Sequence, residues 1–137
     1  MEETLINDYL KTAAKTYKKL DEQLNKLGLY RGQPSLIVIL YGNEGITQKE
    51  LCKKLSVTPA TMTKMVNRME KSGFIIKRTD SEDLRVSRIY LTDKAREIKQ
   101  DIFNLFEEFE TECFKGLSEE EKDTFKKVLV KVLKNLS

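Results

Sequence analysis

The spacing of apolar side chains predicts a long first helix over residues 4–27. Apolar positions recur there at alternating steps of four and three, a period typical of helices that pack against other helices. Gly28 ends the stretch. The periodicity alone leaves two interpretations open, burial against the chain's own core or contact with a second copy of the chain. The positions are Ile6, Leu10, Ala13, Tyr17, Leu20, Leu24 and Leu27.

A short second helix is predicted over residues 35–41, directly after Pro34, which suits a first helical turn. Its side chains are apolar on nearly every side, from Leu36 to Leu40. A helix that is apolar all round is buried all round, so we expect it at the centre of the domain. The segment from Gly42 to Gly45 then breaks the chain.

Residues 47–72 have the pattern of two helices joined by a tight turn. The segment Thr47-Gln48-Lys49-Glu50 is typical of a capping box and starts a helix that runs through Leu55. Thr58 suits the N-cap of the next helix and Pro59 its first position. Gly73 ends that helix. The sequence therefore predicts a helix-turn-helix.

The second of these helices has two different faces. Met62, Met65, Val66 and Met69 share one face, which is typical of a core side. The opposite face offers small hydroxyls, an amide and cations, which donate hydrogen bonds to phosphates and base edges. We therefore favour DNA contact over plain solvation for this face. Its residues are Ala60, Thr61, Thr63, Lys64, Asn67, Arg68 and Lys71.

A β-hairpin is predicted next, from two short β-branched stretches around the polar tip 80–83. Ile89 and Leu91 fall on one face of the returning strand, and Arg88 and Tyr90 on the other. A long helix is then predicted from Thr92 to about residue 114. A capping box at residues 118–121 starts a last helix with its own apolar seam.

Composition narrows the possible chemistry of the 137 residues. The chain has no histidine, which removes histidine-based zinc sites and Ser-His-Asp or Cys-His catalysis. Cys52 and Cys113 show no metal-ligand spacing, and we interpret both as inert core thiols. We therefore expect no metal, no cofactor and no enzyme activity. Residues 49–91 carry ten basic and five acidic side chains, which points to a localised contact with a polyanion.

The chain contains no apolar run of the length that a membrane span needs. Its acidic N-terminus lacks the basic-then-apolar order of a signal peptide. We expect a cytoplasmic protein without a membrane partner.

In this order, the motifs resemble the MarR (multiple antibiotic resistance regulator) family of winged helix-turn-helix transcription factors. The resemblance covers essentially the whole chain, and its most specific part is the wing, with Asp83, Arg85 and the pair Leu91-Thr92. It implies a mainly α fold with a small β-hairpin wing (α+β), and a homodimer on a pseudo-palindromic operator in double-stranded DNA. Residues 1–31 and 92–137 would form dimerisation helices around a DNA-binding lobe at 32–91. Repression would be the expected mode of regulation.

The resemblance also implies roles for individual residues. Arg85 would be the wing arginine, paired with Asp83, and the recognition helix would run from Thr58 to Ser72. Relatives often have arginine at the position of Lys77, whereas here it stands next door at Arg78. The predicted DNA-binding residues are Thr47, Gln48, Thr58, Pro59, Ala60, Thr61, Thr63, Lys64, Asn67, Arg68, Lys77, Arg78, Asp83 and Arg85.

Many relatives respond to a small aromatic or phenolic effector. Tyr17, Tyr30, Arg31 and Tyr41 lie in segments that would border the effector cleft, although each also fits an ordinary interfacial role. The alternative function is a winged helix that binds protein without specific DNA binding. Such a module need not keep Lys64, Asn67, Arg68 and Arg85 together.

Overall fold

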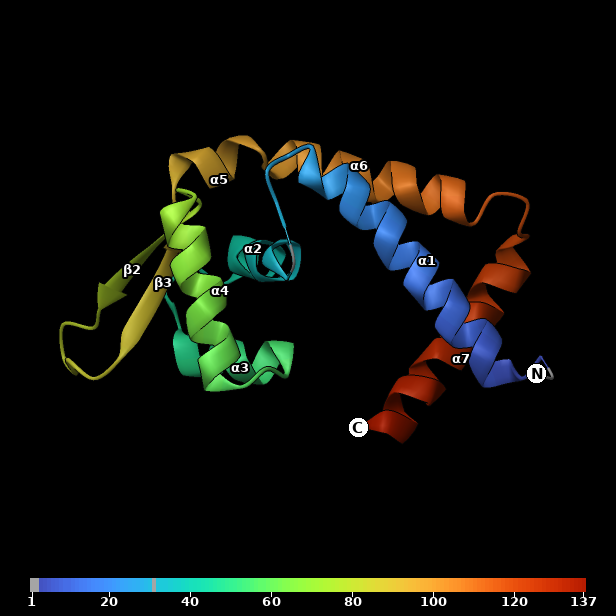
Figure 1. Ribbon diagram of the computed structural model, residues 1–137, viewed down its shortest axis with the longest axis horizontal. Helices are drawn as coiled ribbons and strands as arrows, with labels where there is room; N and C mark the ends of the chain where they lie inside the picture. The colour runs from blue at the N-terminus through green and yellow to red at the C-terminus, as the bar shows by residue number, and fades with distance from the viewer. Residues whose placement is uncertain (1–2, 31) are drawn as a thin grey trace. The chain divides into compact units, whose positions relative to one another are not determined.

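The computed structural model describes residues 3–30 and 32–137, which form helices and one small antiparallel sheet (Figure 1). The chain divides into two compact units, the first ending at Phe103 and the second running from Asn104 to Ser137. The elements are α1 (Leu5–Asn25), α2 (Gln33–Gly42), β1 (Ile46–Thr47), α3 (Gln48–Leu55), α4 (Pro59–Lys71), β2 (Ile75–Thr79), β3 (Ser87–Leu91), α5 (Asp93–Glu97), α6 (Lys99–Cys113) and α7 (Glu119–Leu136).

The predicted starts of α4 and α7 are confirmed by their caps, whereas α2 begins at Gln33, two residues earlier than predicted. The Thr58 hydroxyl accepts a hydrogen bond from the backbone amide of Thr61 at the start of α4, and Pro59 is the first helical residue. Ser118 and Glu121 form the complete predicted capping box of α7. At α3, only the hydroxyl half of the predicted box is found among the described residues. Thr47 is also the last residue of strand β1, where its backbone pairs with Arg88 of β3.

Helix α2 lies at the centre of the first unit, as predicted, but it is not buried on every side. Leu36, Ile37 and Leu40 are fully buried, whereas Val38 and Ile39 are half-buried. Thirteen further apolar side chains among the described residues are buried with them. They come from α1, the loop after it, all three strands, α3, α4, the segment before β2, α5 and α6. They are Leu24, Leu29, Ile46, Leu51, Met62, Val66, Met69, Phe74, Ile75, Ile89, Leu91, Ala95 and Ile102.

The sheet has three strands in the order β1-β3-β2, all antiparallel. Ile89 and Leu91 of β3 face the core, as the alternation predicted. Strand β1 was not predicted, because two residues are too few to show a period. It pairs Ile46 with Ile89 and Thr47 with Arg88, and so joins the hairpin to the start of α3.

Two predictions, one about a C-terminal helix and one about the two cysteines, are wrong. The helix expected from Thr92 to about residue 114 is interrupted at Ile98, so that α5 and α6 are separate helices. The Cys113 thiol is exposed and Cys52 is half-buried, so neither is an enclosed core thiol. Cys113 was placed on the apolar seam of this helix, but the seam is covered only further towards its start, where Ile102 is fully buried and Leu105, Phe106 and Phe109 are half-buried. No helix in the described ranges is long and apolar enough to cross a membrane.

Helix α7 has no buried residue. Its apolar side chains repeat along one face and stay open to solvent, with Leu133 at 67% exposure. Phe125 contacts Phe114 at a ring-centroid distance of 5.8 Å, within the second unit. A helix with this much uncovered apolar surface needs a covering partner. The exposed residues are Phe125, Val128, Leu129, Val130, Leu133 and Leu136.

Candidate nucleic-acid interface

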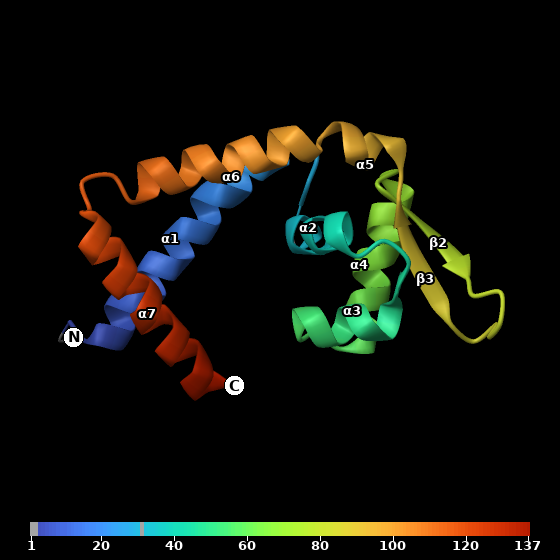
Figure 2. The ribbon, with the colours of Figure 1, turned by 180° about the vertical axis from the view of Figure 1, so that it is seen from behind.

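Three parts of the first unit meet around one hollow: the start of α3, the start of α4 and the part of the wing loop that leads into β3. The β2–β3 hairpin that forms the wing extends beyond α3 and α4 in both views (Figures 1 and 2). Strand β1 fixes this arrangement, because it places the α3 N-terminus beside β3. The hollow is lined by Thr47, Gln48, Lys49, Cys52, Pro59, Arg85, Val86 and Ser87.

Helix α4 carries the predicted division into core side and outer side. Met62, Val66 and Met69 are fully buried. Lys64 and Asn67 are exposed on the opposite side, with no acidic side chain between Pro59 and Met69. Because its core side is fixed by packing, α4 presents its outer side as a rigid, cationic surface. The exposed residues of this surface are Ala60, Thr61, Thr63, Lys64, Asn67, Arg68 and Lys71.

Two predicted contact residues are bonded to each other across the helix-turn-helix. The Gln48 side-chain amide donates to the Thr63 hydroxyl at 3.0 Å. Thr63 in turn donates its only hydroxyl proton to the carbonyl oxygen of Pro59 at 2.9 Å. Thr63 therefore has no free proton to donate to DNA, contrary to the simplest interpretation of its position. Gln48 keeps its amide oxygen and a second N–H, and Thr63 holds it in place.

At the wing tip, the carboxylate of Asp83 accepts hydrogen bonds from the guanidinium and from the backbone amide of Arg85. The Arg85 Nε donates to Asp83 Oδ1 at 3.0 Å and an Arg85 terminal nitrogen donates to Oδ2 at 3.1 Å. The Arg85 backbone amide also donates to Oδ1, at 3.0 Å. The hydrogen bond from Arg85 lowers the pKa of Asp83, and the same bond raises the pKa of Arg85. The arginine side chain remains 89% exposed, so the grip orients it without covering it.

A second ion pair, which sequence reasoning did not predict as part of the site, lies where the wing loop joins the two strands. Arg88 donates from Nε to Asp80 Oδ1 at 2.8 Å and from Nη1 to the Gly45 carbonyl oxygen, also at 2.8 Å. The bond from Arg88 is the main reason why the pKa of Asp80 is lowered. The residues come from the loop before β1, the wing loop and β3. The only sequence signal was the outward position of Arg88 on β3.

The neighbouring cations on β2 have different surroundings. The Arg78 guanidinium lies 5.2 Å from the ring centroid of Tyr90, on the outer face of the sheet. The backbone amide of Lys77 donates to the Glu70 carboxylate at 3.2 Å, and its side chain is exposed. Arg78 is therefore oriented by an aromatic ring, whereas Lys77 is linked to Glu70 only through its backbone amide.

The predicted effector residues are not gathered in one hollow of the described chain. Tyr30 lines a small hollow together with Arg68 of α4 and residues of α1 and α2. Tyr41 donates to the Ala95 carbonyl oxygen instead, and burial raises its pKa to about 12. Tyr17 is 73% exposed on α1. Arg31 lies outside the described residues.

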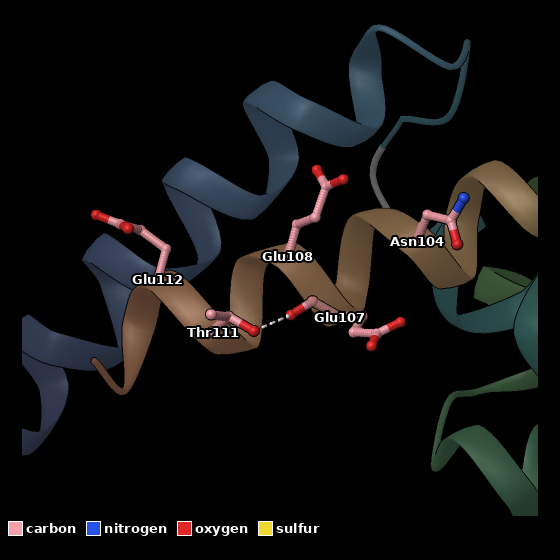
Figure 3. Close-up of a pocket in the computed structure, with 5 residues that line it drawn as sticks. All are labelled: Asn104, Glu107, Glu108, Thr111 and Glu112. Carbon is pink, nitrogen blue, oxygen red and sulfur yellow. Dashed lines mark hydrogen bonds between the residues drawn. The ribbon is translucent and has the colours of Figure 1, made fainter. Parts of the chain in front are cut away.

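A separate hollow on α6 differs sharply from the cationic face. Figure 3 shows its carboxylates, and the Thr111 hydroxyl donates to the backbone carbonyl oxygen of Glu107. Within the described ranges, no group of histidine, cysteine or acidic residues could hold a metal ion. A hollow of this charge repels anions, so it fits neither DNA nor a phenolate. Its lining residues are Asn104, Glu107, Glu108, Thr111 and Glu112.

Comparison with known proteins identifies the class of protein that carries this face. The MarR family model matches residues 29–87. The chain is 32% identical over 121 residues to the uncharacterized HTH-type transcriptional regulator YwoH of Bacillus subtilis (strain 168), with 88% of each chain covered.

Solved structures show the same likeness. The MarR protein from Peptoclostridium difficile is 27% identical, with a TM-score of 0.89 over 99% of this chain and 89% of that one. The S. aureus MepR–DNA complex is 25% identical, with a TM-score of 0.84 over 98% and 97% of the two chains. This chain belongs to the MarR family, and it is a DNA-binding transcriptional regulator with a winged helix-turn-helix fold.

Proposed function

We propose that the chain is a repressor that binds a pseudo-palindromic operator as a homodimer. The observation that carries the proposal is the wing arginine: both carboxylate oxygens of Asp83 bond one edge of the Arg85 guanidinium, and the side chain is still 89% exposed. An arginine that served only the fold would be covered by its partners. One that is oriented and exposed is suited to entering a groove, where a narrow A·T tract concentrates negative potential.

Helix α4 supports the same proposal through the type of group it presents. Lys64 and Asn67 project from its outer side, and the two can bond phosphates and base edges respectively. The Thr61 hydroxyl adds a polar group beside them, 3.0 Å from the Thr58 hydroxyl. We assign α4 to the major groove and the wing to the adjacent minor groove. The other predicted contacts, on α3 and β2, flank these two elements.

The homodimer is supported by apolar surface that the chain itself leaves open. The seam of α1 and the face of α7 expose large aliphatic side chains, including Leu10 at 57% and Leu133 at 67%. We assign the segments 1–31 and 92–137 to this interface and 32–91 to the DNA-binding lobe. Two-fold symmetry of the dimer then requires half-site centres about 10–10.5 base pairs apart, or a multiple of that.

Release by a small aromatic or phenolic effector completes the proposal. The hollow that contains Tyr30 also contains Arg68, which belongs to α4. A phenolate bound there would contact a cation of the recognition helix and could displace that helix from the groove. Addition of 4-hydroxybenzoate to the protein–DNA complex is the direct measurement, and unchanged affinity at millimolar ligand would remove this part of the proposal.

The test of the proposed function uses a duplex that the protein itself selects from a randomised pool of about 30 base pairs, roughly three helical turns. Fluorescence anisotropy should show specific binding that weakens steeply with salt. A dimer with roughly 6–10 phosphate contacts loses about three to five decades of affinity between about 50 and 200 mM salt. A flat salt response, or a pool with no enriched sequence, would instead favour a winged helix that binds protein.

A further inference from the structure

We propose that Arg88 is a positioning residue for DNA binding: it anchors the wing tip, and with it Arg85, to the loop that leads into the helix-turn-helix. The inference rests on the proposed role of the wing in DNA binding. It goes beyond that role because Arg88 itself need not touch DNA. Arg88 acts through Asp80, and Asp80 acts on the segment that carries Asp83 and Arg85.

The anchor begins at the loop before β1. Arg88 reaches the carbonyl oxygen of Gly45 with one nitrogen and the Asp80 carboxylate with another, both at 2.8 Å. The Gly45 backbone has a φ of +84°, which favours glycine. A side chain there would also meet the Tyr90 ring at 3.5 Å. The carbonyl that receives Arg88 is therefore held by a backbone conformation that other residues would strain.

From Asp80, the contacts continue into the wing tip. The second carboxylate oxygen of Asp80 accepts hydrogen bonds from the backbone amides of Glu82, at 3.3 Å, and Asp83, at 3.1 Å. Asp83 is the residue whose side chain grips Arg85. An unbroken series of hydrogen bonds thus links the Gly45 loop to the Arg85 guanidinium. All but one of its bonds are 3.1 Å or shorter, and each passes through a charged group, which makes such bonds stronger than neutral ones.

Burial indicates that the Arg88 link is more than a loose surface pair. The side chains of Arg88 and Asp80 are 39% and 18% exposed, against 89% for Arg85. Arg78 lies directly opposite Arg88 in the sheet, but its guanidinium packs on the Tyr90 ring. Asp80 therefore pairs with Arg88. Only a forked guanidinium can reach both acceptors at once, because a lysine ammonium is a single point of charge.

The first experiment needs no DNA, so it is independent of the proposed function. Amide hydrogen exchange of Glu82 and Asp83 should be faster in Asp80→Ala, which removes the carboxylate oxygen that accepts from both amides. It should also be faster in Arg88→Gln, which leaves Asp80 intact but unanchored. If Arg88→Gln left both amides as protected as in the parent, Asp80 would hold the tip without Arg88 and the inference would be wrong.

The second experiment measures affinity for the selected duplex in a double-mutant cycle of Arg88→Gln and Arg85→Ala. Arg88→Gln alone should weaken binding on the order of three- to tenfold, within the usual coupling between contacting residues. In the Arg85→Ala background, Arg88→Gln should change the logarithm of the affinity by less than about half of its effect in the parent. Additive effects would mean that Arg88 acts by its own charge or contact, which would overturn the proposal.

Two further variants separate positioning from charge and from general damage. Arg88→Lys keeps the charge but not the fork, so it should bind as weakly as Arg88→Gln. Recovery of parent affinity by lysine would show that charge alone matters. Arg96→Gln is the matched control, because it also removes one cation from surface ion pairs, which Arg96 forms with Glu44 at 2.7 Å and with Asp93 at 3.2 Å. Glu44 keeps its bond from the Leu91 amide, so this control should bind DNA like the parent.

Discussion

Removing Asp83 tests whether the wing works by orientation or by charge. Asp83→Ala deletes a negative charge near a polyanion, so charge counting predicts tighter DNA binding. Orientation predicts the opposite result. The Asp83 carboxylate receives three hydrogen bonds from Arg85, two from the guanidinium and one from the backbone. Without these bonds, the Arg85 side chain is mobile in the free protein and must be ordered when DNA binds.

The expected size follows from these contacts. Ordering one flexible side chain on binding costs roughly two- to tenfold in affinity. The gain from removing one exposed charge is smaller, because salt screens it over about 8 Å at physiological ionic strength. Asp83→Ala should therefore weaken binding by a few-fold. Arg85→Ala should weaken it by roughly 5- to 150-fold per lobe, the loss typical of a groove-reading arginine.

Fluorescence anisotropy on the selected duplex, at one salt concentration, measures both variants. Their thermal unfolding midpoints should match the parent, since Arg85 is almost fully exposed and exposed ion pairs add little stability. The double variant should bind like Arg85→Ala alone, because Asp83 has nothing left to orient. If Asp83→Ala binds more tightly than the parent, the orientation argument is refuted and the wing contributes only loose charge.

Three other outcomes are expected. Ser56 has a φ of +52° at the end of α3, so Ser56→Gly should relieve strain and raise the free energy of unfolding by up to about 1 kcal/mol in denaturant melts, whereas a lower value would contradict this. Leu133→Asp should give a folded monomer by sedimentation velocity, and a persistent dimer would place the interface elsewhere. Tyr41→Phe should cost about 1 kcal/mol or less, for one hydrogen bond to the Ala95 carbonyl. Because the folded pKa of Tyr41 is raised from 10.0 to about 12, the parent should lose stability as pH rises from 10 towards 12, and a parent–variant difference that did not shrink there would contradict the assignment.

Local signals in the sequence were sufficient for most of the helices. The cap at Thr58, the proline after it and the buried methionines of α4 are short-range features, and each is found where the pattern predicted it. The break at Ile98 was missed because the apolar period continues across it without a glycine or proline. Strand β1 was missed because it exists only through pairing with a strand some forty positions later.

The same distinction applies to the candidate interface. The outer side of α4 and the Asp83–Arg85 pair depend on residues close in sequence, so their positions could be predicted, and their contacts with DNA stay predictions. The anchor at Arg88 depends on sheet register and on a loop 43 positions away, which no local pattern reveals. The bond from Gln48 to Thr63 likewise depends on how α3 crosses α4. Chemistry at the surface was readable from the sequence, whereas bonds between distant segments were not.

The Gly45 loop limits how far the wing can be treated as a transferable part. An engineer who wished to change minor-groove preference would naturally exchange residues 80–88 for those of a relative. Such a graft carries Arg88 and its carboxylate partner but leaves behind the acceptor at Gly45 and the aromatic ring that lies against it. A successful exchange would have to extend the graft to Tyr90 and include residues 44–46, as one unit assembled from two separate stretches of sequence.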